Sequence, residues 1–303
     1  MMHVPVLTNE VLEYLSPNPN ENFIDGTVGQ GGHALTILQK TSPDGKLLGI
    51  DKDATQIENA KSEMKYFGHR VVLVHDSYVN VKNIVERVQF GPVSGMLLDL
   101  GYSSWHLEDS KKGFSFNKDE ALDMRYDSEI LNPKSQILNE LTAKKIVNEY
   151  SESDLKRILE EFGEESFAKR IAKEIITQRK IKKIETTLQL VAVLERAIPR
   201  KFHHGKIHCA TRTFQALRIA VNDELGSLAK ALPLVLSILE PGGRLVIIAF
   251  HSLEDRIIKN FFKERAEEGI VKILTKKPIM ASDAEVLVNP RARSAKLRAV
   301  IKL

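Results

Sequence analysis

A short apolar run that ends in an acid and a glycine-rich turn constrains the fold of this chain more than any other stretch. Phe23 and Ile24 precede Asp25, four glycines follow between positions 26 and 32, and apolar residues at helical spacing begin at Ala34. Glycine tolerates positive φ and lets a ligand approach the main chain, and a helix start offers unpaired N–H groups. The pattern predicts a strand, a tight turn and a helix that hold a nucleotide-like ligand, although an ordinary glycine-rich turn would have the same composition.

The spacing of these glycines indicates which kind of ligand to expect. It reads G-x-x-G-x-G-G at positions 26–32, which differs from the G-x-G-x-x-G of dinucleotide-binding folds. The acid directly before the first glycine suits a cationic ligand better than a pyrophosphate. S-adenosylmethionine carries an ammonium and a sulfonium group and no phosphate, so it is the cofactor that this turn predicts.

Further apolar runs alternate with segments of helical spacing and are followed by polar residues. The run at 46–51 ends in Asp51, the run at 71–74 is followed closely by Tyr78, and the run at 95–99 ends in Asp99. This alternation predicts an α/β fold with a doubly wound, mostly parallel sheet. Ligands of such sheets bind at the carboxyl ends of the strands. We therefore expect these side chains and Asp25 to share one crevice, although each acid alone could merely cap a helix.

The alternation stops in the middle of the chain. Residues 110–209 show helical faces and no clear strand, and an apolar run at 244–250 then resumes the sheet. We therefore expect a cofactor-binding domain formed by residues 1–109 and 210–303, with an inserted helical substrate-recognition subdomain at 110–209. The last seven residues alternate apolar and polar side chains, as a half-exposed edge strand would.

Two basic segments could contact a polyanion. The formal net charge is +4 and the pI is near 8.9, which allows such a partner without requiring it. The run Arg179–Lys183 suits either a phosphate contact or a solvated helix end. Near the C-terminus, four cations stand within eight residues with no acid between them, and we predict that they bind RNA: Arg291, Arg293, Lys296 and Arg298.

Composition narrows the class of protein further. The single cysteine, Cys209, argues against an internal disulfide and a cysteine-rich zinc site, and we expect no bound metal. The N-terminal residues do not resemble a signal peptide, and no apolar run approaches the ~20 residues of a membrane span. We therefore expect a soluble cytoplasmic protein that does not associate with a membrane.

Several motifs resemble one known family from end to end. They are Asp-Gly-Thr at 25–27, Gly-Gly-His at 31–33, Leu-Asp-Leu-Gly at 98–101, Gly-Phe-Ser-Phe at 113–116, Leu-Asp-Met-Arg at 122–125, Ala-Thr-Arg-Thr-Phe-Gln-Ala-Leu-Arg at 210–218, Phe-His-Ser-Leu-Glu-Asp-Arg at 250–256 and Asn-Pro-Arg at 289–291. In this order they resemble the bacterial MraW/RsmH family. Its members are S-adenosylmethionine-dependent methyltransferases of small-subunit ribosomal RNA that modify the N4 amine of a cytosine.

The resemblance implies a class I methyltransferase-like fold with a helical insertion, and it implies a set of cofactor contacts. These map onto Gly31, Gly32, His33, Asp51, Tyr78, Asp99 and His106. Three positions depart from the family pattern. Trp105-His106 stands where Pro-Gln is usual, which puts the contact of His106 in doubt, and Cys209 stands where Pro is usual. The implied partner is small-subunit ribosomal RNA, within an assembled or assembling small subunit.

Two residues are our candidates for catalysis. Asp99 could accept a hydrogen bond from the cytosine amine, or its carboxylate could face the cofactor instead. His251, after the fifth expected strand, could help Asp99, or it could merely cap the next helix together with Ser252. Other functions stay open: a methyltransferase acting on another RNA, a protein or a small-molecule amine, or a non-catalytic RNA-binding module that kept the fold.

Overall fold

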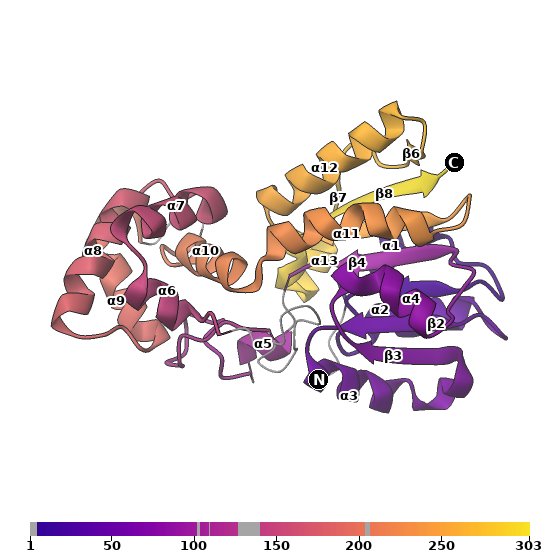
Figure 1. Ribbon diagram of the computed structural model, residues 1–303, viewed down its shortest axis with the longest axis horizontal. Helices are drawn as coiled ribbons and strands as arrows, with labels where there is room; N and C mark the ends of the chain where they lie inside the picture. Colours follow the sequence, from indigo (N-terminus) through magenta and orange to yellow (C-terminus); the bar gives the residue numbers. More distant parts are fainter. Residues whose placement is uncertain (1–4, 102–103, 109, 127–139, 204–206) are drawn as a thin grey trace. The chain divides into compact units, whose positions relative to one another are not determined.

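The computed structural model describes residues 5–101, 104–108, 110–126, 140–203 and 207–303 of the chain. Residues divide into two compact units, one formed by Met1–Gly101 with Leu225–Leu303 and the other by Tyr102–Glu224. The first unit contains the sheet, and the second is helical (Figure 1). Within the described part of the chain, no helix combines the length and the apolar character needed to cross a membrane.

The first unit is built on an eight-stranded sheet in the order β3-β2-β1-β4-β5-β8-β6, with β7 pairing to β8. Strands β1 to β5 run parallel, and β8 runs antiparallel to β5, β6 and β7. The strands are β1 (Phe23–Asp25), β2 (Leu47–Asp51), β3 (Val71–His75), β4 (Gly95–Asp99), β5 (Arg244–Ala249), β6 (Val271–Ile273), β7 (Ile279–Met280) and β8 (Lys296–Lys302). The expected doubly wound, mostly parallel sheet is therefore confirmed.

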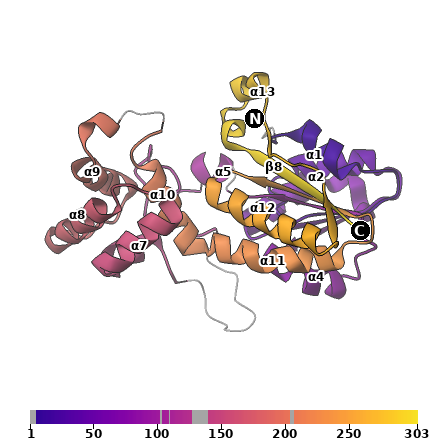
Figure 2. The ribbon, with the colours of Figure 1, turned by 90° about the horizontal axis from the view of Figure 1, so that it is seen from above.

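Helices cover both faces of this sheet because its central strands are apolar on both sides. Leu97 of β4 packs into the cluster formed with α1 (Thr8–Leu15), α2 (Gly32–Lys40) and α3 (Ala54–Glu63). Its neighbours Met96 and Leu98 pack into the opposite cluster, with α4 (Val81–Arg87), α11 (Glu224–Ile238) and α12 (Ser252–Glu267). Figure 2 shows α11 and α12 on one side of β8 and α1 and α2 on the other. Short elements complete the unit: η1 (Lys65–Arg70), η2 (Tyr78–Asn80), α13 (Asp283–Val288) and η4 (Pro290–Ser294).

The expectation of an edge strand at the C-terminus is wrong. Strand β8 lies inside the sheet, between β5 and β6. Its polar position Arg298 is 7% exposed, and the guanidinium pairs with the carboxylate of Asp255, with Nε 2.6 Å from Oδ1 and Nη2 3.2 Å from Oδ2. The alternating pattern therefore reflects a buried ion pair and not a solvated face.

The second unit is a helical bundle with a core of its own. It comprises α5 (Ser104–Glu108), α6 (Ala143–Glu149), α7 (Glu152–Gly163), α8 (Ala168–Ile181), α9 (Thr187–Ala197), η3 (Arg200–Phe202) and α10 (Thr211–Asn222). The side chains of Thr142, Ser151 and Thr186 cap α6, α7 and α9. A Cβ at Gly163 would lie 2.8 Å from the carbonyl oxygen of Arg212, so α7 and α10 approach too closely there for any side chain.

The boundaries of this unit differ from the expected 109/110 and 209/210. The chain divides after Gly101 and after Glu224, which assigns α5 and α10 to the helical unit. Helix α10 belongs there because its Phe214 and Leu217 are buried in the helical core. The apolar spacing continues from α10 into α11, but Asp223 adopts φ 46° and ends α10. Sequence periodicity alone does not reveal such a break.

Candidate functional site

Backbone hydrogen bonds connect the glycine turn after β1 to the neighbouring strands β2 and β4. The amide of Gly26 donates to the carbonyl of Leu97 at 2.9 Å, and that of Val28 donates to Ile50 at 2.9 Å. Gly29 and Gly31 have φ of 51° and 90°, a backbone conformation that favours glycine. Gly31 is the N-cap of α2 and provides no side chain to cap it. The predicted cofactor residues Gly31 and Gly32 therefore place main-chain groups at this helix start.

Asp51 holds the same turn from β2. One of its carboxylate oxygens accepts the amide of Gly29 at 2.8 Å, and the other accepts the amide of Asp53 at 2.9 Å. Asp53 in turn caps α3 by accepting the amide of Thr55. The carboxylate thus fixes the position of the turn and the start of α3. A carboxylate is the type of acceptor that a ribose hydroxyl would need.

A group of buried and half-buried polar side chains lies between β1, β4 and α2. The amide of Asp99 donates to the hydroxyl oxygen of Thr27 at 2.7 Å, and the amide of Thr27 donates to the carboxylate of Asp25 at 3.1 Å. His33, 5% exposed, has its Nε2 3.7 Å from Oδ2 of Asp99. Neither ring nitrogen of His33 nor Oδ1 of Asp99 has a hydrogen-bond partner among the described residues.

Burial dominates the electrostatics of this group. It raises the pKa of the Asp25 carboxyl from 3.8 to about 7, with His33 and the amide of Thr27 opposing the change and Asp99 and Asp51 adding to it. Three carboxyl groups therefore repel one another across a small volume that contains unpartnered polar atoms. A ligand with positive charge and hydrogen-bonding groups would relieve both conditions, and S-adenosylmethionine fits this donor set.

Two further predicted cofactor residues lie on different units. Tyr78 begins η2 after β3, and it packs over the turn, since a Cβ on Gly26 would lie 3.3 Å from the Cβ of Tyr78. His106 lies on α5 of the helical unit, where it is 5% exposed and packs edge-on against the rings of Phe114 and Tyr126, with centroids 5.1 Å away. The structure thus gathers Gly31, Gly32, His33, Asp51, Tyr78 and Asp99 in the first unit.

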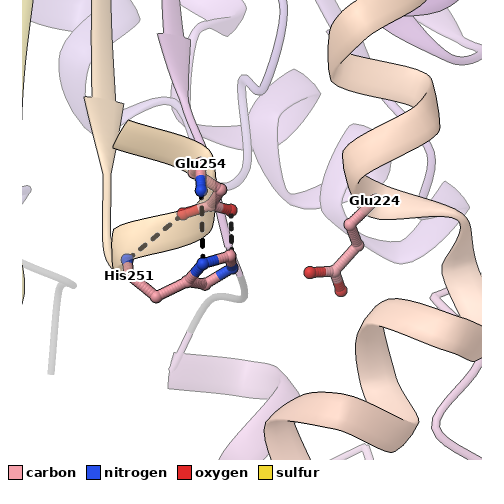
Figure 3. Close-up of side chains that lie close together, drawn as sticks. All are labelled: Glu224, His251 and Glu254. Carbon is pink, nitrogen blue, oxygen red and sulfur yellow. Dashed lines mark hydrogen bonds and ion pairs between the residues drawn. The ribbon is translucent and has the colours of Figure 1, made fainter. Parts of the chain in front are cut away.

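His251 and Asp99 follow neighbouring strands, as expected from the sequence. Strands β4 and β5 pair in parallel, with Asp99 opposite Ile248. His251 is the N-cap of α12, where its Nδ1 accepts the amide of Glu254 at 3.4 Å (Figure 3). The Glu254 carboxylate reaches back to the amides of Phe250 and His251 in a capping box. The capping role of His251 is therefore present, and its catalytic role stays a prediction.

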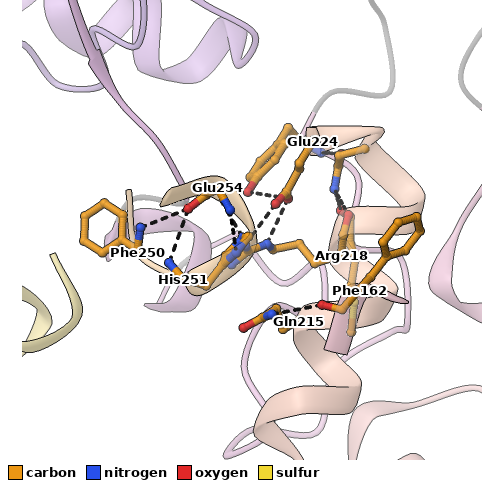
Figure 4. Close-up of polar contacts among 10 residues, drawn as sticks. Phe162, Gln215, Arg218, Glu224, Phe250, His251 and Glu254 are labelled. Carbon is orange, nitrogen blue, oxygen red and sulfur yellow. Dashed lines mark hydrogen bonds and ion pairs between the residues drawn. The ribbon is translucent and has the colours of Figure 1, made fainter. Parts of the chain in front are cut away.

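The motif at 210–218 mainly organises the helical unit (Figure 4). Arg218 forms a two-pronged ion pair with Glu224, with nitrogen–oxygen distances of 2.8 and 2.9 Å. The side-chain amide of Gln215 donates to the carbonyl of Phe162 at 2.9 Å. These contacts join α10 to α7 and to the first turn of α11, so Gln215 and Arg218 of this motif have a packing role.

Three of the four predicted RNA-binding cations lie at the surface. Arg293 is exposed, and Arg291 and Lys296 are half-buried, on η4 and at the start of β8. The prediction for Arg298 is wrong, because this residue is buried and its guanidinium forms an ion pair with Asp255. Counting cations in the sequence could not separate the four, since the partner acid lies 43 residues away.

Sequence reasoning placed Asp25 in the expected crevice but missed Thr27, which the structure shows beside it. Thr27 connects the strand ends, because its hydroxyl oxygen accepts from the amide of Asp99 while its own amide donates to Asp25. The signal was visible as Asp-Gly-Thr directly after the first strand. The sequence did not reveal that Thr27 would bridge β1 and β4, because those strands are 70 residues apart.

The parallel sheet, the glycine turn and the strand-end acids define a class I methyltransferase-like α/β protein with a helical insertion. The family model described as the MraW methylase family matches residues 1–303, and the chain belongs to this family. Its relatives named ribosomal RNA small subunit methyltransferase H include a protein of Geobacter sulfurreducens, 46% identical over 316 residues that cover 99% of both chains. Another, from Heliobacterium modesticaldum, is 45% identical over 317 residues that cover 99% of this chain and 98% of the relative. Among solved structures, an rRNA methylase of Streptococcus thermophilus matches with a TM-score of 0.44 and 10% identity over 100% of this chain and 99% of that one.

Proposed function

We propose that this protein transfers a methyl group from S-adenosylmethionine to the exocyclic N4 amine of a cytosine in small-subunit (16S) ribosomal RNA. The observation that carries the proposal is the group formed by Asp25, His33 and Asp99 beside the glycine turn, in which Asp25 and His33 are buried. Family membership and relatives named for ribosomal RNA small subunit methylation support the choice of reaction and substrate. The alternative is a methyltransferase that acts on another RNA, a protein or a small-molecule amine.

The cofactor contacts follow from the donor set. Bound S-adenosylmethionine supplies an electrophilic methyl group on a positively charged sulfur. Asp51 at the end of β2 would accept the ribose hydroxyls, and Tyr78 would lie beside the adenine. Gly31, Gly32 and His33 would contact the methionine portion at the start of α2, and His106 would complete the set.

Asp99 is the proposed acceptor for the amine. The lone pair of the cytosine N4 nitrogen is delocalised into the ring, which makes it a weak nucleophile. A carboxylate that accepts one N–H hydrogen bond returns electron density to the nitrogen, and correct orientation supplies much of the remaining acceleration. When the N–C bond forms and the sulfur–methyl bond breaks, the amine must lose one proton. Oδ1 of Asp99 has no hydrogen-bond partner among the described residues, so it is available to take that proton.

The substrate must present the cytosine outside a duplex, because a paired base could not reach the methyl group. Arg291, Arg293 and Lys296 would contact RNA phosphates, which fix position without reading sequence. We also expect the substrate to be an assembled or assembling small subunit in the cytoplasm.

One experiment tests reaction and substrate together. The protein would be incubated with isotope-labelled cofactor and either naked 16S RNA or small subunits from cells that lack the gene, and methylated cytosine would be mapped by mass spectrometry. We expect one labelled N4-methylcytosine position, formed more efficiently on subunits than on naked RNA. Label on a protein or on another RNA alone would support the alternative. Tight cofactor binding without any transfer would indicate a binding module.

A further inference from the structure

An exposed phenylalanine stands out on the helical unit. Phe202 is 46% exposed at the end of η3, the single turn that follows α9 and Pro199. The turn is well fixed, because the amide of Phe202 donates to the carbonyl of Pro199 at 2.9 Å and a ring nitrogen of His203 lies 2.8 Å from the carbonyl of Ile198. A hydrogen-bonded turn therefore presents this ring to solvent.

The ring is also supported from the side. Phe167, the half-buried N-cap of α8, places its ring centroid 5.2 Å from that of Phe202 at an interplanar angle of 51°. The amide of Phe167 donates to the buried carboxylate of Glu165 at 2.8 Å, which holds this residue in place. The ammonium of Lys201 lies 5.1 Å from the centre of the Phe202 ring. Phe202 is thus oriented by two neighbours without being covered by them.

The segment that carries Phe202 is rich in cations, whereas Glu164 and Glu165 precede Phe167 on the neighbouring turn. No acid occurs between Glu195 and Asp223, a stretch that contains six cations. Two of the six are engaged with acids, Arg196 with Glu174 and Arg218 with Glu224. On the two turns that carry the rings, four exposed cations form no ion pair among the described residues: Lys169, Arg170, Arg200 and Lys201.

An exposed aromatic ring among cations matches the chemistry of unpaired RNA. A nucleobase can stack on the ring while nearby cations contact the adjoining phosphates, and stacking requires a base that is not already within a duplex. We propose that Phe202, supported by Phe167 and Lys201, is a stacking platform for an unpaired base of the RNA substrate. The proposal rests on the ribosomal RNA function and names a second contact with that substrate, in addition to the contact with the reacting cytosine.

Replacement of the ring tests the stacking. Removal of one stacked base contact weakens binding by about 5- to 150-fold. Phe202→Ala should therefore weaken the affinity for a single-stranded 16S fragment within this range, whereas Phe202→Trp should stay within about 3-fold of the wild type because every base can stack on an indole. Fluorescence anisotropy would measure the RNA affinity, and calorimetry should show an unchanged cofactor affinity.

Leu188→Ala is the matched control. Leu188 lies on α9 of the same unit and is 44% exposed, but it is not aromatic. This variant should bind RNA like the wild type, and thermal melting would verify that both variants are folded. The salt dependence separates stacking from charge: Phe202→Ala should leave the salt slope unchanged, whereas Arg200→Ala or Lys201→Ala should lower it by about 0.7.

Three outcomes would overturn the platform. The first is wild-type RNA affinity in Phe202→Ala, and the second is a Phe202→Trp variant as weak as the alanine variant. The third is a loss of binding to intact small subunits but not to naked RNA, which would assign the ring to a ribosomal protein. A wild-type enzyme that methylates no ribosomal RNA would instead refute the proposed function, and this result is distinguishable from all three.

Discussion

At the scale of single residues, Asp25 shows that burying a carboxyl group at this site makes the stability of the folded chain depend on pH. Its carboxyl is 1% exposed, yet it lies where a cationic cofactor would need a negative charge. Because its pKa is raised from 3.8 to about 7, the folded chain holds the proton more tightly than the unfolded chain does. The resulting stabilisation is complete below about pH 4 and is lost as the pH rises through about 7.

Asp25→Asn should remove this dependence on pH, because the amide resembles the protonated acid and does not titrate. The difference of about three pKa units between the unfolded and folded states corresponds to roughly 4 kcal/mol of unfolding free energy. In the absence of cofactor, the unfolding free energy of the variant should rise relative to that of the wild type between about pH 4 and pH 7. At pH 7 the variant should be the more stable protein. Urea denaturation across this range measures the difference. Asp44→Asn, at an exposed carboxyl, is the control, and parallel pH profiles for Asp25→Asn and the wild type would contradict the expectation.

Asp99 carries the second prediction at this scale. Asp99→Asn keeps the backbone amide that donates to Thr27, so the turn should stay in place. The amide side chain is a poor proton acceptor, and we expect single-turnover methylation to fall by at least ~100-fold while cofactor affinity changes less. Rapid-quench kinetics and calorimetry measure the two quantities. If cofactor binding is lost instead, Asp99 belongs among the cofactor contacts and another group accepts the proton.

At the scale of elements, α12 begins at a residue that was also a candidate for catalysis. His251→Ala removes the acceptor for the amide of Glu254 and should lower the unfolding free energy by about 1 kcal/mol, the usual effect of losing an N-cap. His251→Ser retains a capping oxygen and should restore most of this stability. The methylation rate then distinguishes a catalytic role of His251 from a capping role. A low rate in both variants would support a contact with the cytosine. A rate that recovers in the serine variant would show that His251 acts only as the helix cap.

The strands were the most predictable elements, and the reason is physical. Buried parallel strands require continuous apolar runs, and such runs end abruptly at Asp25, Asp51 and Asp99, each the last residue of its strand. Short elements such as β7 and α13 leave no periodicity to recognise. The interior position of β8 could not be predicted either, because Arg298 appears solvated until Asp255 is placed beside it by the fold.

At the scale of the whole molecule, the chain consists of two units with separate cores, the second inserted between β4 and β5. The insertion was predictable because strand signals stop for about a hundred residues. Its boundaries were not, because α10 and α11 share one apolar pattern across Asp223. The predicted cofactor residues divide in the same way, with His106 on the helical unit and the others on the sheet unit.

Affinity for RNA should arise from a few local groups of cations, since a net charge of +4 on 303 residues is modest. Replacement of Arg291, Arg293 and Lys296 by alanine should lower the salt slope of RNA binding by about 2, which is the sum of three single-strand phosphate contacts. Binding isotherms at several salt concentrations measure the slope.

The control is the double variant Arg298→Met with Asp255→Leu, which removes a buried cation together with its partner and is compatible with folding because apolar residues can replace such pairs. Its slope should equal that of the wild type. An unchanged slope in the triple variant would identify the segment as ordinary solvated surface, and a reduced slope in the double variant would return Arg298 to the RNA interface.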